Sequence, residues 1–302
     1  MSHEELAKYL SLKNLPESEV EFAGEIPFEA VASYRDRALA HIAEHLELPG
    51  FRPGKVPRAI ALQKAGEIAV LEESVEFFIK DFYPALIAAH KIDAVGRPEI
   101  RITKLATGNP VGISVRVCAL PEVTLPRNWM ELHEKIPQEP YAGELPKSDP
   151  PPSPKEEQKA REYMAHSARR AKLIDSLMAK SAVAVPRVFI ESEQEKILAQ
   201  MREDIKRFGL SFDEYLVKIN KTEETMRSEL RESARRRAKL QLVLNKIAQE
   251  EKIEPDKDAA ETEVKRALEH FPDAKRDLLR IHIETVLRNE KVLKLLEGEK
   301  HK

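Results

Sequence analysis

Between two helical patterns lies the stretch Leu48-Pro49-Gly50-Phe51-Arg52-Pro53-Gly54-Lys55-Val56-Pro57-Arg58. Its glycines permit positive φ, and its prolines fix φ and remove a hydrogen-bond donor, so little regular backbone is expected before Pro57 opens the next helix. One aromatic ring and three cations stand in it: Phe51, Arg52, Lys55 and Arg58. A loop that holds such side chains in water suits docking onto a larger, partly acidic partner.

A second interpretation of the loop stays open. In this interpretation the loop is an ordinary turn between helices, and Phe51 folds back into the core as single aromatic residues usually do. For a loop of this composition alone, that turn is the commoner arrangement.

The pattern Gly50-Phe51-Arg52-x-Gly54-Lys55-x-Pro57 resembles the ribosome-docking signature of trigger factor, the bacterial nascent-chain chaperone. The resemblance extends over the flanking chain, from about Leu10 to Pro126. It implies that Gly50, Phe51, Arg52, Gly54 and Lys55 bind ribosomal protein and RNA near the exit tunnel. Pro53 departs from the pattern, because the family often has a basic residue there, and this predicts weaker docking.

Composition sets broad limits on the protein class. The chain has 302 residues, enough for two domains, and its formal net charge of -2 gives no case for a polyanion binder as a whole. Cys118 is the only cysteine, so no disulfide within the chain is possible, which fits a reducing cytosol. The acidic start, Met1-Ser2-His3-Glu4-Glu5, has no apolar secretory core, and no run approaches the ~18 apolar residues of a membrane span. We expect a soluble cytoplasmic protein without a membrane partner.

Residues 1–125 are predicted to form an α+β domain. Two short strands are expected within residues 10–26, helices over residues 28–47 and 57–65, and then a longer helix that carries apolar residues from Ile68 to Leu86. Gly66 is expected to close the second helix and Pro84 to kink the third. Two more strands follow, over residues 99–104 and 113–119. Strands, helices and strands again are typical of a compact α+β domain.

Residues 126–154 are rich in proline and predict a semi-rigid linker. Trigger factors usually carry a prolyl-isomerase domain of the FKBP kind at this place. Such a domain needs roughly 100 residues, a normal length for a small domain. The linker is much shorter, so the resemblance implies a form of the family that lacks the isomerase domain.

Residues 155–302 are predicted to be entirely helical. Helices are expected over residues 155–181, 186–208, 212–219, 222–251, 257–271 and 274–296. Ser211 and Glu214 match a capping box at the start of one of them. The order of these helices is similar to the C-terminal domain of trigger factors, which binds unfolded chains with helical arms.

The sequence shows no catalytic constellation, no phosphate loop and no Cys/His cluster with metal-ligand spacing. Without such sites, the function that the sequence favours is binding. Flexible methionines suit contacts with varied unfolded clients, and the candidates on helices are Met164, Met178, Met201 and Met226. For each of them taken singly, a plain core position is the commoner role.

The preferred hypothesis is an ATP-independent chaperone without cofactor or metal. It would dock on the ribosome and shield apolar segments of nascent or unfolded chains, with large-subunit protein, ribosomal RNA and these chains as partners. A ribosome-independent cytosolic holdase or assembly chaperone is the alternative, and a peptidyl-prolyl isomerase is a weaker one. A weak homodimer stays open.

Overall fold

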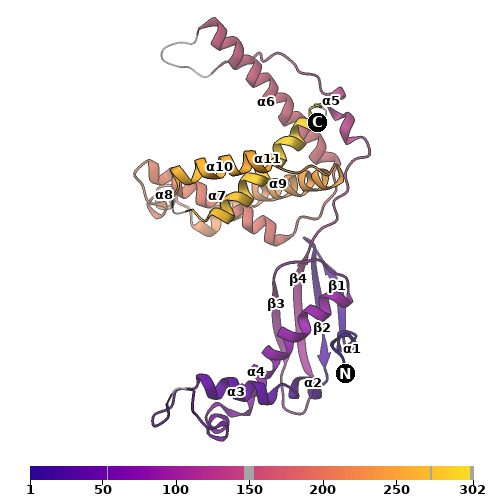
Figure 1. Ribbon diagram of the computed structural model, residues 1–302, viewed down its shortest axis with the longest axis vertical. Coiled ribbons are helices and arrows are strands. Elements are labelled where there is room, and N and C mark those ends of the chain that lie inside the picture. Colours follow the sequence, from indigo (N-terminus) through magenta and orange to yellow (C-terminus); the bar gives the residue numbers. More distant parts are fainter. Residues whose placement is uncertain (53, 146–152, 273, 300–302) are drawn as a thin grey trace. The chain divides into compact units, whose positions relative to one another are not determined.

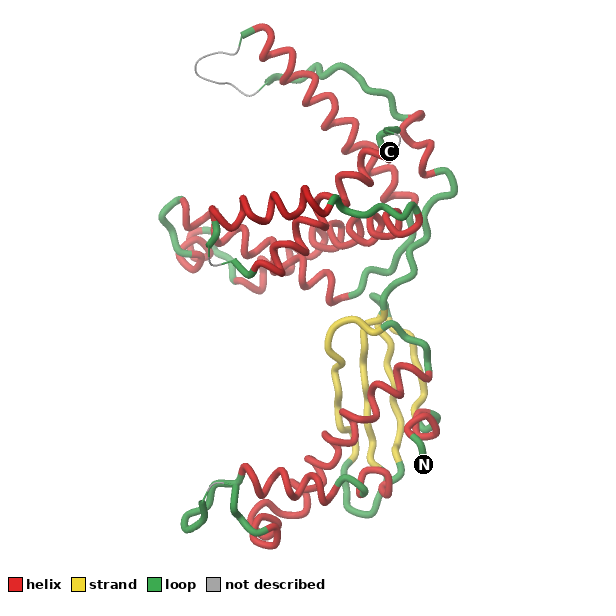
Figure 2. The backbone as a smooth tube through the Cα atoms, in the orientation of Figure 1, coloured by secondary structure: helices red, strands yellow, loops and turns green. Residues whose placement is uncertain are grey.

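The computed structural model describes residues 1–52, 54–145, 153–272 and 274–299, and its chain divides into two compact units. The first unit comprises Met1–Pro121 with Ala184–Phe189, and the second comprises Glu122–Val183 with Ile190–Lys302. The first holds a sheet with helices and the second is helical throughout the described residues (Figures 1 and 2). The predicted fold class, α+β followed by all-α, is confirmed.

The sheet of the first unit has four antiparallel strands in the order β1-β2-β4-β3. Their bounds are Leu10–Leu15 (β1), Glu19–Ile26 (β2), Ala94–Lys104 (β3) and Val111–Ala119 (β4). All four lie where the sequence predicts strands, but β3 begins five residues earlier than expected. Its first part contains Gly96 with φ 79° and a register shift between Val95 and Glu99, and such a bulge hides the alternation that identifies a strand.

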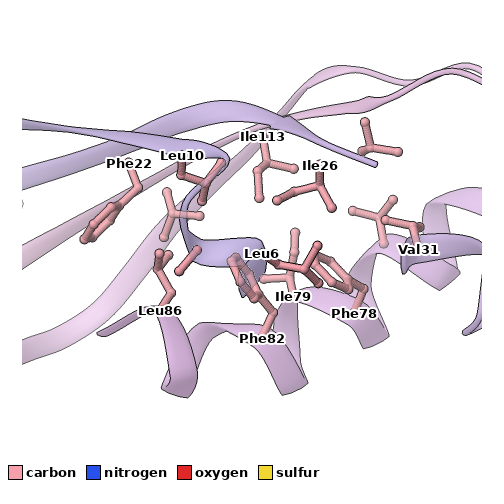
Figure 3. Packing of buried hydrophobic residues seen from close by; sticks show 14 of the residues in the cluster. Leu6, Leu10, Phe22, Ile26, Val31, Phe78, Ile79, Phe82, Leu86 and Ile113 are labelled. Atoms are coloured by element: carbon pink, nitrogen blue, oxygen red, sulfur yellow. The ribbon is translucent and has the colours of Figure 1, made fainter. Parts of the chain in front are cut away.

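One face of this sheet carries the core of the first unit. Helix α4 (Arg58–Ala89) lies against that face, and short helices α1 (His3–Ala7) and α2 (Phe28–Ala32) contact α4. In Figure 3 the side chains of Phe78 and Phe82 project from α4 toward the sheet, which contributes Phe22 to the same cluster. These three rings are fully buried.

The helix predicted over residues 28–47 is two helices, α2 and α3 (Arg35–His45). The hydroxyl of Ser33 donates to the carbonyl oxygen of Ala30 at 2.7 Å, which satisfies the last turn of α2. The ring of Tyr34 then packs edge-on against Phe78, with centroids 5.9 Å apart. A helix former can be recognised from sequence, but a break fixed by such a tertiary ring contact cannot.

Helix α4 is interrupted where the sequence predicts an end. Gly66 has φ 85° and ψ 159°, a conformation essentially restricted to glycine, and it separates the first eight residues of α4 from the rest. Pro84 does not break the helix, because Gly66 is the one residue of α4 with non-helical angles. Pro84 is exposed, so water can bind the carbonyl that lacks its usual partner.

Gly66→Ala should destabilise the first unit by about 1–3 kcal/mol, because a side chain at this φ and ψ is strained. Among the described residues no atom beyond the neighbouring backbone lies within 4 Å of the added Cβ, so backbone strain and not a clash is the cause. The measurement is hydrogen exchange of the amides on both sides of the kink. Lys64→Ala, at an exposed position two residues before Gly66, is the control and should leave exchange unchanged.

The second unit contains a 3₁₀ turn, Trp129–Glu131, and seven helices among its described residues. Their bounds are Leu132–Lys135 (α5), Pro154–Lys180 (α6), Arg187–Arg207 (α7, whose first residues belong to the first unit), Phe212–Lys218 (α8), Glu223–Glu250 (α9), Lys257–His270 (α10) and Arg276–Leu296 (α11). The main core joins α6, α9 and α11 through Leu177, Ile247 and Val292.

The chain that precedes α6 packs against the second unit. Trp129 is buried in the main core. Arg169 of α6 donates from its side chain to the carbonyl oxygens of Ile136, at 2.8 Å, and His133, at 3.0 Å. Part of the proline-rich stretch is therefore held by α6, while residues 146–152 lie outside the described residues.

Candidate functional site

The loop singled out by the sequence is anchored by a small apolar cluster between α3 and α4. We call it the loop anchor, and it consists of Ala38, Leu39, Ala43, Val56, Ala61 and Val70. Val56 is the member that comes from the loop itself, and it is buried. Sequence reasoning missed Val56, because an isolated valine between Lys55 and Pro57 carries no periodicity.

The loop backbone is held by short-range hydrogen bonds. The amide of Phe51 donates to the carbonyl of Leu48 at 3.1 Å, with Pro49 and Gly50 between them and φ 91° at Gly50. This is the order of proline and glycine that a turn with positive φ at its third residue requires. The amide of Lys55 donates to the carbonyl of Arg52 at 3.0 Å, and Gly54 has φ 75°. Pro53 lies outside the described residues.

The side chains expected to bind face solvent. Phe51 is 38% exposed and belongs to none of the described core clusters. Gly50, Arg52, Gly54 and Lys55 are exposed as well. Within the described ranges neither Arg52 nor Lys55 forms an ion pair, so both charges are free to meet an acidic partner.

Ion pairs also join α3 to α4. Arg37 lies 2.9 Å from Asp81 and places its guanidinium 4.3 Å from the ring centroid of Phe77. The imidazole of His41 lies 2.7 Å from the carboxylate of Glu73. Because these groups are half exposed, each contributes little stability, and the loop anchor holds the two helices together.

The four methionines proposed as client contacts fall into two groups. Met178 is buried in the main core of the second unit, and Met226 is buried in a smaller core with Leu198 and Leu216. Met164 and Met201 are partly exposed. The second pair therefore keeps some contact with solvent, although Met201 also packs against the smaller core, whereas the first pair is covered by other side chains.

Larger apolar side chains on the C-terminal helices are more exposed than these methionines. Leu278, Ile281 and Val286 of α11 are each more than half exposed, and we call them the α11 patch. Phe271, which directly follows α10, is exposed too. Leu278 and Ile281 are three residues apart and so lie on one helix face. The sequence showed these residues only as part of a helical pattern, and their exposure comes from the packing of α11.

A charged cluster ties α6 to α11 in the second unit. Arg170 donates to Glu297 at 2.6 Å and to Glu290 at 2.9 Å, while His166 lies 3.3 Å from Glu297. Burial raises the pKa of Glu297, but the hydrogen bonds and charge of Arg170 and the charge of His166 outweigh it, and the pKa lies below its usual value. The same carboxylates raise the pKa of Arg170.

The described residues contain no group of three or more histidine, cysteine or acidic side chains placed to hold a metal ion. None of the helices in the described ranges combines the length and the apolar character that crossing a membrane demands.

Two family models match the chain. The model described as "Bacterial trigger factor protein (TF)" matches residues 9–141, and the model described as "Bacterial trigger factor protein (TF) C-terminus" matches residues 154–297. Together they cover most of the sequence. Only residues 142–153 lie between them.

Curated relatives and a solved structure agree with these models. Proteins named trigger factor from Rhodococcus opacus (strain B4) and Mycolicibacterium smegmatis are both 34% identical over 116 residues, which is 38% of this chain and 25% of each relative. The chain thus matches about a quarter of the length of these relatives. A chain from the structure reported as "Promiscuous Substrate Recognition in Folding and Assembly Activities of the Trigger Factor Chaperone" aligns with TM-score 0.54 and 17% identity. That alignment covers 96% of this chain and 99% of the other.

Proposed function

Because the chain belongs to the trigger factor family, we propose that it is an ATP-independent chaperone that docks on the ribosome and shields apolar segments of unfolded chains. The observation that carries the docking step is the exposed Phe51, which Arg52 and Lys55 follow in the chain, on a loop with its own hydrogen bonds and a buried anchor. Large aromatic side chains and arginine are enriched among the residues that dominate the binding energy of protein interfaces.

The partners follow from this chemistry. Arg52 and Lys55 would contact acidic side chains or phosphates at the exit of the large ribosomal subunit, and Phe51 would enter an apolar pocket there. The proposed location is the cytoplasm, where translating ribosomes are. An isomerase activity is not part of the proposal, because the interval between the two family matches is much shorter than the roughly 100 residues of a small domain.

The second step is the holding of unfolded clients. The α11 patch and Phe271 offer apolar surface to solvent, and the partly exposed Met164 and Met201 offer adaptable contacts elsewhere on the helices. A chaperone for many clients needs dispersed apolar contacts without strict geometry, and flexible or exposed side chains supply them.

We expect the purified protein to suppress aggregation of a chemically unfolded model client without ATP. Leu278→Asp/Ile281→Asp should weaken this suppression about three- to tenfold, because each charge removes apolar contact area from the α11 patch. The measurement is light scattering of the diluted client against chaperone concentration. Ile68→Asp, an exposed isoleucine of the first unit, is the matched control. Full suppression by the α11 variant would show that clients bind elsewhere.

A second candidate function is a holdase that works without the ribosome. The observation that favours it is Pro53, which stands where the family often has a basic residue. This candidate predicts client holding with no ribosome binding, so the co-sedimentation experiment below separates the two.

A further inference from the structure

Strand β3 is an outer strand of the sheet in the first unit. It pairs with β4 on one side, and no strand of the described residues pairs with its other side (Figure 1). Residues 184–189 meet β3 near its start, where Arg187 binds Glu99 and Val188 lies next to Gly96. The final five residues, Ile100–Lys104, are all exposed. An outer strand of this kind presents backbone donors and acceptors to another extended chain.

An apolar groove runs beside this edge. Ile100 and Ile102 pair directly with Val115 and Ile113 of β4, so their side chains lie on the face that α4 covers. Val115 and Ile113 are each 1% exposed, whereas Ile100 is 39% and Ile102 is 40% exposed. Helix α4 therefore covers this face of the sheet over β4 but leaves it partly uncovered over β3.

The space left there is about 500 Å³ and is lined mainly by Ile79, Tyr83 and Pro98 in addition to Ile100 and Ile102. Glu76 and Lys80 of α4 also line it, and their opposite charges give the groove no net sign. A volume of this size accommodates several apolar side chains.

The opposite face of β3 indicates which charge a partner should carry. Glu99 binds Arg187, and Lys104 binds Glu25 across Gly112. Arg101 pairs with Ser114, a neutral residue whose hydroxyl donates to Glu21. Arg101 is exposed and forms no ion pair with a described residue. A carboxylate on a neighbouring strand would give Arg101 the cross-strand pair that it lacks.

We infer that β3 accepts an extended segment of an unfolded client as a fifth strand. Alternate apolar side chains of that segment enter the groove, and an acidic side chain between them faces Arg101. The inference rests on the proposed function, because the segment belongs to a client chain. Main-chain hydrogen bonds supply affinity that does not depend on sequence, while the groove and Arg101 favour an apolar–acidic–apolar order.

Features of β3 itself limit the length of the added strand. Pro98 cannot donate a hydrogen bond, and the register shifts again between Ile102 and Lys104. About five residues therefore remain for pairing. A segment this short binds weakly and leaves quickly, which suits a chaperone that must release its client.

The test uses the full chain and a fluorescein-labelled nonapeptide with a central Val-Glu-Val sequence. Binding is measured by fluorescence anisotropy, and hydrogen exchange of residues 99–104 is followed with and without peptide. We expect saturable binding together with slower exchange of these amides. The same peptide with alternate amides N-methylated, or with lysine in place of glutamate, should bind at least about threefold more weakly, since it loses hydrogen bonds or faces Arg101 with a like charge.

Matched variants locate the site. Ile100→Thr/Ile102→Thr keeps β-branched residues in the strand and should weaken peptide binding about tenfold, because apolar contact in the groove is lost. Leu12→Thr is the control: Leu12 is 42% exposed on β1, the other outer strand, and pairs with Phe22 on the same face. That variant should bind the peptide as the original protein does.

The outcomes separate this inference from the proposed function. Normal suppression of client aggregation without peptide-dependent protection of residues 99–104 overturns the inference and leaves the chaperone proposal intact. Equal binding of the original and N-methylated peptides overturns it as well. If protection at β3 instead grows with protein concentration in the absence of peptide, a second copy occupies the edge and the inference is wrong. If the unaltered protein neither suppresses client aggregation nor binds the peptide, both proposals are contradicted.

Discussion

Phe51→Ala/Arg52→Ala/Lys55→Ala should lower the affinity for vacant ribosomes at least about thirtyfold. Truncating a buried aromatic anchor with its flanking arginine costs about 2–4 kcal/mol at a binding hot spot, and 1.4 kcal/mol corresponds to a tenfold change. The fold should survive, because all three side chains are exposed while the loop anchor, including Val56, is unchanged. The measurement is co-sedimentation with 70S ribosomes at low and moderate salt.

A control variant of the same composition exists in the second unit. Lys206, Arg207 and Phe208 are also a lysine, an arginine and an exposed phenylalanine, and all three are exposed. Lys206→Ala/Arg207→Ala/Phe208→Ala should pellet with ribosomes as the original protein does. Binding should weaken with rising salt, because Arg52 and Lys55 act by charge. If the original protein fails to pellet at low salt, ribosome docking is absent and the ribosome-free holdase becomes the better proposal.

Arg170→Ala should destabilise the second unit by about 2–3 kcal/mol at pH 7. The side chain of Glu297 is 5% exposed, and Arg170, 24% exposed, donates two hydrogen bonds to it. Without Arg170 a nearly buried carboxylate keeps its charge but loses its main partner, which is among the costly changes in a folded protein. Urea unfolding followed by tryptophan fluorescence measures it, because Trp129 is the only tryptophan and lies in the main core of this unit.

The stability difference between the original protein and the Arg170→Ala variant should depend on pH in a predictable direction. In the original protein the pKa of Glu297 is lowered in the folded state, so its stabilisation is present above the unfolded pKa, about 4.3, and is lost as pH falls through the folded value. In the Arg170→Ala variant the effect of burial gains weight and the pKa rises. A fall in pH then protonates Glu297, which in the variant has lost its hydrogen bonds from Arg170. The difference in stability between the two proteins should therefore shrink as the pH falls below about 5.

Two comparisons test this explanation. Arg280→Ala breaks a more exposed pair with Glu284 on the same helix, α11, and should change stability by less than about 0.5 kcal/mol. Arg170→Ala/Glu297→Gln should recover part of the loss, because the double variant no longer buries an unpaired charge. An Arg170→Ala loss that stays constant from pH 7 to pH 4 would contradict the assigned role of Glu297.

Local patterns predicted most of the fold. The capping box of Ser211 and Glu214 is present at the start of α8, and Gly66 interrupts α4 where expected. Signals of this kind depend on a few neighbouring residues and can be read without the tertiary structure. Helix α1 was missed although Ser2 and Glu5 form a capping box, because its five residues are too few to show a period.

Features that depend on tertiary packing could not be predicted. The break between α2 and α3 is fixed by Tyr34 packing on Phe78, a residue 44 positions later in the chain. The loop residues were identified by their pattern, yet the exposure of Phe51 and the anchoring by Val56 depend on how α3 meets α4. The exposure of the α11 patch and the groove beside β3 likewise depend on which surfaces the neighbouring helices leave uncovered.

The way α6 holds the preceding chain has an evolutionary consequence. Arg169 and Arg161 bind carbonyl oxygens of His133, Ile136, Tyr141 and Gly143, which every amino acid possesses. Substitutions along residues 133–143 therefore leave these bonds intact, whereas a change at either arginine removes them. Sequences of related proteins should drift freely along that stretch while retaining the two arginines, so its apparent lack of pattern is compatible with a fixed path.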